Sequence, residues 1–182
     1  MTATTNRYRL GAIGDFEVAR RWALWDKIWG ALRRQENCLL DFNKISPWLR
    51  QKLYRGVQEI PVETIVGSVN RAQDFNRNFR PLRDTSSRRW VQMHVLANEQ
   101  GWPPIDVYKI GNLYFVEDGH HRVSVARYLK HKVIEAIVWD YNIEATFDLN
   151  ISMAQLSTAL RKQQASIEPW VPCQPCVHLC AC

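Results

Sequence analysis

Residues 105–129 read Ile-Asp-Val-Tyr-Lys-Ile-Gly-Asn-Leu-Tyr-Phe-Val-Glu-Asp-Gly-His-His-Arg-Val-Ser-Val-Ala-Arg-Tyr-Leu. Apolar residues alternate in 105–110 and return in 113–116, and Gly111-Asn112 lies between the two runs, so this part predicts a β-hairpin with a two-residue turn. Residues 123–129 are expected to form a short helix. The stretch therefore predicts a domain in which a strand leads into a helix through a short polar turn.

The polar turn between the hairpin and the helix has the composition of a phosphate-binding loop. Backbone N–H groups at a helix start lack intrahelical partners and carry partial positive charge, so they bind anions. Gly119 has no Cβ to block the approach of a phosphate. Arg122 can donate two parallel hydrogen bonds to phosphate oxygens, and His121 can donate another. Gly119, His121 and Arg122 are therefore candidate phosphate-binding residues.

The same turn offers groups for catalysis and for metal binding. His120 and Asp118 are candidate general bases, because each can take up a proton from a substrate hydroxyl. Glu117 is a candidate Mg²⁺ ligand beside the phosphates, because hard cations prefer oxygen ligands. A structural interpretation stays open, in which Asp118 caps the helix, His121 is a satisfied buried histidine and Arg122 pairs with a carboxylate.

The chain around this turn is expected to have three parts. Residues 1–56 form a helical extension, residues 57–142 form a compact α/β domain, and residues 143–182 hold a helix and a cysteine-rich tail. The pattern predicts, in chain order, a helix over 15–36, a helix over 46–56, a strand over 59–66, a polar loop or short helix over 69–81, a helix over 86–100, a strand over 133–139 and a helix over 152–164.

The first predicted helix carries an unusual apolar stripe. Val18, Trp22, Trp25, Trp29 and Leu32 recur at spacings of four, three, four and three, which places them on one side of a helix. Three tryptophans are a large amount of apolar surface. Such a stripe is typical of packing against a domain or of the contact between two copies in a homodimer.

The cysteines are concentrated at the end of the chain. Cys38 stands alone and is expected in the core as a small apolar residue. The tail offers Cys173, Cys176, His178 and Cys180, which are candidate Zn²⁺ ligands because thiolates and imidazole suit that ion. A reactive tail without a designed site is the alternative, because a closed zinc site usually joins two separated pairs of ligands.

The run from Ile60 to Tyr141 resembles the ParB/sulfiredoxin superfamily. Three segments carry the resemblance, namely 60–65, 104–107 and 114–127, which follow one another in the order of that family. The Asp-Gly-His-His-Arg part looks closest to the Asp-Gly-His-x-Arg form of a free-serine kinase of this fold. The resemblance implies a mixed-sheet domain that binds a nucleotide (ATP, ADP or CTP) by its phosphates, together with Mg²⁺.

The loop over 69–81 gains an interpretation from the same resemblance. In this superfamily the loop after the first strand contributes to the nucleotide site, so Arg71 and Arg80 are candidate phosphate contacts. Asp74 is a candidate Mg²⁺ ligand or base. A solvated polar loop is the alternative.

His120 occupies the position of the catalytic cysteine of sulfiredoxin, which argues against sulfiredoxin chemistry in this chain.

Two classes of function follow from these expectations. The first is a nucleotide-dependent phosphotransferase or NTP hydrolase with a small-molecule substrate. The second is a nucleotide-responsive regulator or a nucleic-acid-binding protein, which the net charge of +6 permits. No stretch approaches the ~20 apolar residues of a membrane span, and the start lacks the apolar core of a signal peptide. The expected protein is soluble and cytoplasmic, with no membrane partner.

Overall fold

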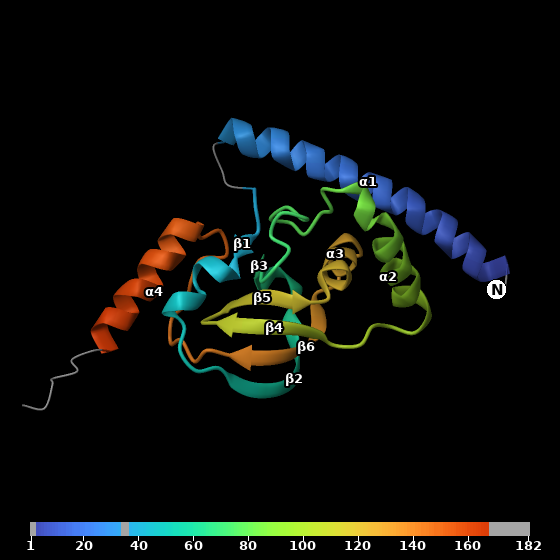
Figure 1. The fold of residues 1–182 in the computed structure, drawn as a ribbon. Coiled ribbons are helices and arrows are strands. Elements are labelled where there is room, and N and C mark those ends of the chain that lie inside the picture. Colours follow the sequence, from blue (N-terminus) through green and yellow to red (C-terminus); the bar gives the residue numbers. More distant parts are fainter. Residues whose placement is uncertain (1–2, 34–36, 168–182) are drawn as a thin grey trace, which may run out of the picture.

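The computed structural model describes residues 3–33 and 37–167 and shows an α+β fold on one mixed, six-stranded sheet (Figure 1). The strand order is β1-β3-β5-β4-β6-β2. The pairs β1–β3, β3–β5 and β4–β6 are parallel, and the other two pairs are antiparallel. The strands are β1 (Leu40–Asp41), β2 (Leu53–Pro61), β3 (Ile65–Ser68), β4 (Ile105–Ile110), β5 (Leu113–Asp118) and β6 (Val133–Asp140). The expected mixed-sheet α+β fold is confirmed.

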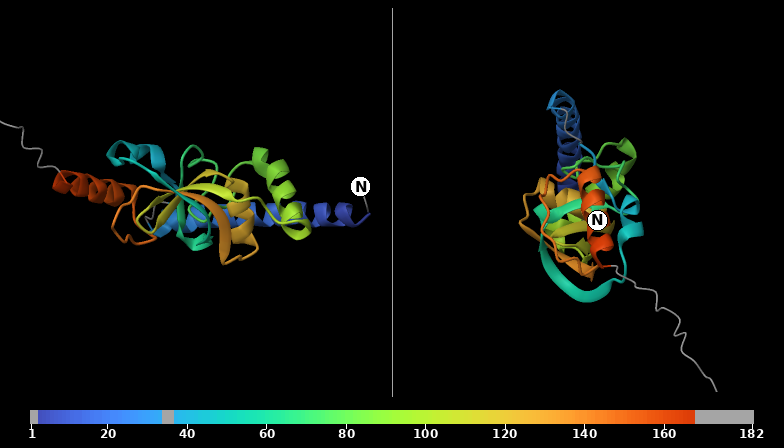
Figure 2. Two further views of the ribbon diagram at one scale, coloured as in Figure 1. Left: turned by 90° about the horizontal axis from the view of Figure 1, so that it is seen from below. Right: turned by 90° about the vertical axis from the view of Figure 1, so that its left-hand side faces the viewer.

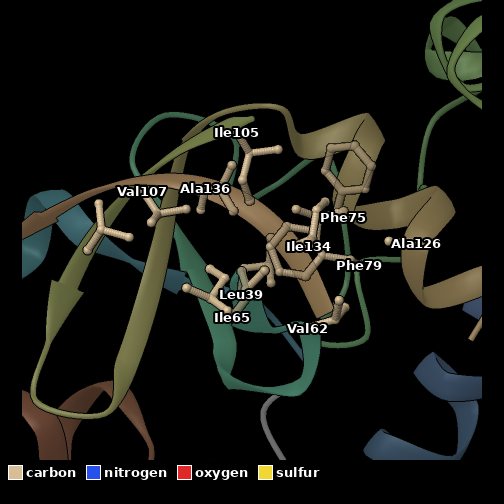
Figure 3. Packing of buried hydrophobic residues seen from close by; sticks show 14 residues of the cluster. Leu39, Val62, Ile65, Phe75, Phe79, Ile105, Val107, Ala126, Ile134 and Ala136 are labelled. Carbon is tan, nitrogen blue, oxygen red and sulfur yellow. The ribbon is translucent and has the colours of Figure 1, made fainter. Parts of the chain in front are cut away.

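Helices cover both faces of this sheet because side chains alternate along its central strands. Val107 and Val116 belong to the cluster on the face that holds α3, whereas Tyr108 and Phe115 belong to the cluster on the face that holds α4. Figure 3 shows the first of these clusters, with Val107 labelled. A third apolar cluster joins α3 to α2 and α1 on the outer side of α3, around the fully buried Trp90. The α-helices are α1 (Ala3–Arg33), α2 (Ser87–Glu99), α3 (His120–Tyr128) and α4 (Met153–Ile167).

The hairpin, the last strand and the helices after residue 85 lie where the sequence predicts them. Gly111-Asn112 is the turn between β4 and β5, and Leu113 pairs with Ile110. Ser152 and Gln155 form the predicted capping box at the start of α4, where the Ser152 N–H donates to Gln155 Oε1 at 2.9 Å. Of the two alternatives for residues 69–81, the structure has the loop, and Phe75 and Phe79 anchor it in the core below α3.

The helix expected over 46–56 is wrong. Ser46–Trp48 forms only a short 3₁₀ turn, and β2 begins at Leu53 and pairs with β6. Gly56, expected to end a helix, lies within β2 at a positive φ of 78°, where the register with β6 shifts. The expected boundary between residues 56 and 57 therefore falls inside a strand. Because β1 and α4 pack into the same apolar cluster, the three expected parts share one core.

Helix α1 differs from its prediction in both length and orientation. It begins at Ala3 instead of residue 15. The side that packs on the domain carries Ala12, Phe16, Ala19 and Ala23, which are nearly inaccessible to solvent. The expectation that the tryptophan stripe is the side packed on the domain is therefore wrong: Trp25 and Leu32 are 58% and 73% exposed, and Trp22 contacts the domain only in part, through Tyr128. Alanines occupy this side because their small side chains let α1 approach α2 and α3 closely.

The cysteines differ from one another in whether the structure describes them. Cys38, expected in the core, is exposed, because its neighbour Leu39 takes the inward position at this point of the chain. The candidate zinc ligands Cys173, Cys176, His178 and Cys180 lie outside the described residues. Within residues 3–33 and 37–167, no helix is long and apolar enough to cross a membrane.

Candidate functional site

The predicted polar turn lies at the edge of the sheet where two parallel strands end. β3 ends at Ser68 and its parallel neighbour β5 ends at Asp118, so both chains leave the sheet on the same side. Gly119 follows at a φ of 100°, and a Cβ at this position would lie 2.4 Å from Ile105 Cγ2. Glycine is therefore required here, both by the backbone conformation and by the space. It lets the chain turn directly from β5 into α3.

The first turn of α3 presents backbone donors at this edge. The first intrahelical bond runs from the Val123 N–H to the Gly119 carbonyl oxygen at 3.0 Å. The amides of His120, His121 and Arg122 precede this bond, so no carbonyl of the helix accepts from them. Together with the helix dipole, they give the start of α3 a partial positive charge.

The start of α3 opens into a cavity of about 400 Å³, which we call the α3 hollow. Its walls are the loop after β3, the first half of α2, and the turn from β5 into α3. The lining residues are Asn70, Arg71, Arg89, Gln92, Met93, Glu117, Asp118, Gly119, His120, His121 and Arg122. Most residues of the predicted turn, and Arg71 from the predicted loop, are therefore brought together.

Two guanidinium groups make the α3 hollow electropositive. Arg71 lies 4.0 Å from the carboxylate of Asp74, at the limit of an ion pair. Arg89 has no ion-pair partner among the residues that the structure describes. Both lower the pKa of the nearby His121, which shows that their charge reaches the α3 start. A negative group bound here would have its charge compensated on two sides.

His120 is held in a buried hydrogen-bonded pair. Its Nε2 lies 2.7 Å from the hydroxyl of Ser68 at the end of β3, and that hydroxyl also accepts a bond from the Arg71 N–H. Burial, and then the charge of Arg71, lower the pKa of His120 to about 4. The imidazole is therefore neutral at pH 7, and its Nε2 is already engaged. This environment makes His120 a weaker general base than the sequence predicts.

His121 has an unengaged ring nitrogen. The side chain is 8% exposed, and its Nδ1 is buried without a hydrogen-bond partner among the described residues. Burial, followed by Arg71 and Arg89, lowers the pKa of this imidazole to about 4, so it is neutral at pH 7. Because buried polar atoms nearly always have a partner, a ligand is a natural candidate for this one.

Arg122 has a structural role in this arrangement. Its Nη1 donates to the carbonyl oxygens of Pro103 and Pro104 at 2.8 and 2.7 Å, and its Nη2 donates to Asp118. The guanidinium thereby ties the entry of β4 to the start of α3. The structure favours the interpretation in which Arg122 pairs with a carboxylate, and Asp118 is the carboxylate it uses.

The acidic candidates do not form a ready metal site. Glu117 and Asp118 are neighbours on a strand and point to opposite faces, and the carboxylate of Glu117 reaches the hydroxyl of Tyr108, whose pKa it raises in addition to burial. Asp74 lies 3.2 Å from Arg83 and does not line the α3 hollow. Among the described residues, no three His, Cys, Asp or Glu side chains gather as metal ligands.

Arg80 lies away from the α3 hollow, in contrast to Arg71. It pairs with Asp26 of α1 at 2.7 Å and stacks on the ring of Trp22. Of the two arginines expected as a second set of phosphate contacts, only Arg71 lies beside the predicted turn. Ser68 and Arg89 belong to the site but were not predicted. The two adjacent arginines at the start of the predicted helix over 86–100 were a signal, but the sequence alone does not say which one faces the turn.

Comparisons of the whole chain with known proteins do not assign this site. No protein-family model, no curated protein and no solved structure matches the chain.

Proposed function

We propose that the chain binds a nucleotide by its phosphates in the α3 hollow, as its resemblance to the ParB/sulfiredoxin superfamily implies. One observation carries the proposal: the free amides of the first turn of α3 and two arginines, Arg71 and Arg89, face the same cavity. Helix N-termini and guanidinium groups are the protein groups that bind phosphate best. The unengaged Nδ1 of His121 supports a polar ligand at the same place.

The size of the cavity is in keeping with this proposal. Small-molecule sites usually enclose about 300–1,000 Å³, and the α3 hollow has about 400 Å³. Asp118, exposed at its rim, is the carboxylate that would meet a Mg²⁺ ion bound to the phosphates, since Mg²⁺ typically takes one or two carboxylates plus phosphate oxygens. Binding of ATP, ADP or CTP with Mg²⁺ is therefore the ligand class we propose.

Binding is tested by thermal-shift and calorimetric titration with ATP, ADP, CTP and GTP, with and without Mg²⁺. Arg89→Ala is expected to weaken the preferred nucleotide by roughly 10- to 100-fold, which corresponds to one lost charge-assisted contact. Arg88→Ala is the matched control, because it removes an exposed guanidinium from the adjacent position that does not line the cavity. Equal affinities in the two variants, or no binding by the native chain, would overturn the proposal.

A phosphotransferase or NTP hydrolase is the more specific alternative, and it is tested at His121, whose Nδ1, unlike the Nε2 of His120, has no hydrogen-bond partner among the described residues. His121→Gln keeps a polar group near the Nε2 position and removes Nδ1, the unengaged atom. If the bound nucleotide is turned over, measured as phosphate release, we expect this variant to lose turnover and to keep binding. A native chain that binds a nucleotide without turnover would instead be a nucleotide-responsive regulator.

A further inference from the structure

Helix α1 lies along the outside of the domain (Figures 1 and 2). Several of its large apolar side chains are exposed on the side that faces away from the domain. We call Leu24, Trp25, Ile28 and Leu32 the outer α1 patch. These side chains are 58%, 58%, 59% and 73% exposed. Their spacings of one, three and four residues place them on one side of the helix, over its last three turns. Single exposed apolar residues are normal on a protein surface, but a continuous run of four is not.

The outer α1 patch lies opposite the side of α1 that packs on the domain. Ala19 and Ala23 are buried against the domain, and at 100° per residue the mean direction of the patch lies about 180° from them. The last third of α1 is therefore apolar on both sides. A helix that is apolar all round is typically buried all round, but no described segment of the chain covers the outer side of this one.

Charges are nearly absent from this part of the helix. Between Trp22 and Leu32 the only charged residues are Asp26 and Lys27. Asp26 faces inward, where it accepts hydrogen bonds from Arg80 and Asn76. Lys27 is exposed beside the patch, and the exposed Arg21 lies one turn before Leu24 and Trp25, at the end of the patch. An anionic lipid surface would call for a richer basic rim, whereas an uncharged face can contact an identical face without repulsion.

We propose that the outer α1 patch binds the same patch of a second copy of this chain, in a two-fold symmetric dimer. The four half-exposed side chains offer on the order of 500 Å² of apolar surface, and a standard interface buries about 800 Å² per partner. Homodimer interfaces are about 65% apolar, so this area is what the centre of one such interface needs. The proposal does not depend on nucleotide binding.

The test is the mass of the full chain in solution, measured by light scattering after size exclusion at several concentrations, with a reductant to prevent disulfide links through the tail cysteines. The native chain is expected to approach twice its 21.3 kDa. Ile28→Glu places a charge in the centre of the patch and should return the mass to that of one chain. Leu10→Glu is the matched control: Leu10 is 66% exposed on the same helix but outside the patch, so the dimer should persist.

Each contrary result has a definite meaning. A native chain of single mass at every concentration would overturn the dimer, and sedimentation of that chain with phosphatidylserine vesicles would assign the patch to a lipid surface instead. A dimer that survives Ile28→Glu would place the contact elsewhere. Far-UV circular dichroism checks that the variant is folded, and Leu32→Glu, in the last turn of α1, replaces it if it is not.

Discussion

The start of α3 and the outer side of α1 differ in how completely the rest of the chain surrounds them. The first seven residues of α3, His120 to Ala126, are all buried, and their polar side chains bond to neighbouring segments of the chain or line a cavity. The outer α1 patch is apolar, but its side chains are 58–73% exposed and belong to none of the buried clusters. The comparison shows that a polar turn can be located from its local pattern, whereas the environment of an apolar stripe depends on which other elements, or which partners, cover it.

The largest effect on stability is expected when a side chain on the inner side of α1 is truncated, and a truncation on the outer side serves as its comparison. Phe16→Ala removes a side chain that is 1% exposed and packs on Trp90 at a ring-centroid distance of 5.6 Å. It should lower the free energy of unfolding by about 3–5 kcal/mol. Trp25→Ala removes a larger ring from the same helix and should change it by less than about 0.5 kcal/mol, because that ring is exposed.

Urea unfolding measures both variants at a protein concentration where the chain is a monomer, so that association does not contribute. A similar loss of stability in the two variants would contradict the distinction between an inner and an outer side. It would show that Trp25 packs within the same chain.

The elements that the sequence predicts correctly are those whose pattern is local. Residues 105–129 alternate, turn and cap in the way the structure shows, because a two-residue turn and a glycine at positive φ need no distant partner. Residues 46–56 were assigned to a helix from Ser46-Pro47, which is an equally good start for a 3₁₀ turn. Their pairing with β6, some eighty residues away, decides the outcome and leaves no local signal.

The same contrast between local patterns and distant contacts applies to the candidate site. The sequence identifies the turn from Glu117 to Arg122, but it cannot separate the side chains that face the cavity from those that support it. The sequence predicts that Arg122 binds phosphate, but in the structure its Nη1 donates to the carbonyl oxygens of Pro103 and Pro104. Arg89 comes from another helix and reaches the cavity only through the packing of α2 beside α3.

Gly119→Ala tests whether the turn into α3 is as constrained as its geometry indicates. The new Cβ would lie 2.4 Å from Ile105 Cγ2, at a backbone φ of 100°. We expect a loss of about 3 kcal/mol in the free energy of unfolding, from backbone strain and overpacking together. In the control Gly101→Ala, φ is also positive but nothing lies within 4 Å, so a loss of about 1 kcal/mol is expected. Equal losses would remove the steric argument.

Arg122→Ala should cost stability even without a ligand. It removes donors from two backbone carbonyl oxygens and from Asp118, and we expect a loss of about 2–3 kcal/mol by urea unfolding. Arg88→Ala, on the surface of α2, should lie within about 0.5 kcal/mol of the native chain. If Arg122→Ala is equally neutral, its guanidinium is available for phosphate, as the sequence suggests.

The buried histidines predict a dependence of stability on pH. The pKa of His120 and of His121 is about 4 in the folded chain, against 6.5 for an ordinary histidine. Between these values the unfolded chain binds more protons than the folded one, so stability is full above pH 6.5 and falls as the pH drops toward 4. Each histidine should contribute on the order of 2 kcal/mol to this loss. Urea unfolding between pH 7.5 and 4.5 should show a shallower fall for His121→Gln than for the native chain, and parallel curves would contradict the assignment.

The smallest effect on stability is expected from Asp118→Asn. The Asp118 side chain is 72% exposed, so its ion pair with Arg122 is screened by water and should be worth less than about 1 kcal/mol in urea unfolding. Its effect on nucleotide affinity separates two roles. If Asp118 only orients Arg122, affinity should be unchanged both with and without Mg²⁺. If Asp118 meets a Mg²⁺ ion on the phosphates, the gain in affinity that Mg²⁺ gives should be lost in the variant, while binding without Mg²⁺ should stay the same or improve, because a negative charge near the phosphates has been removed.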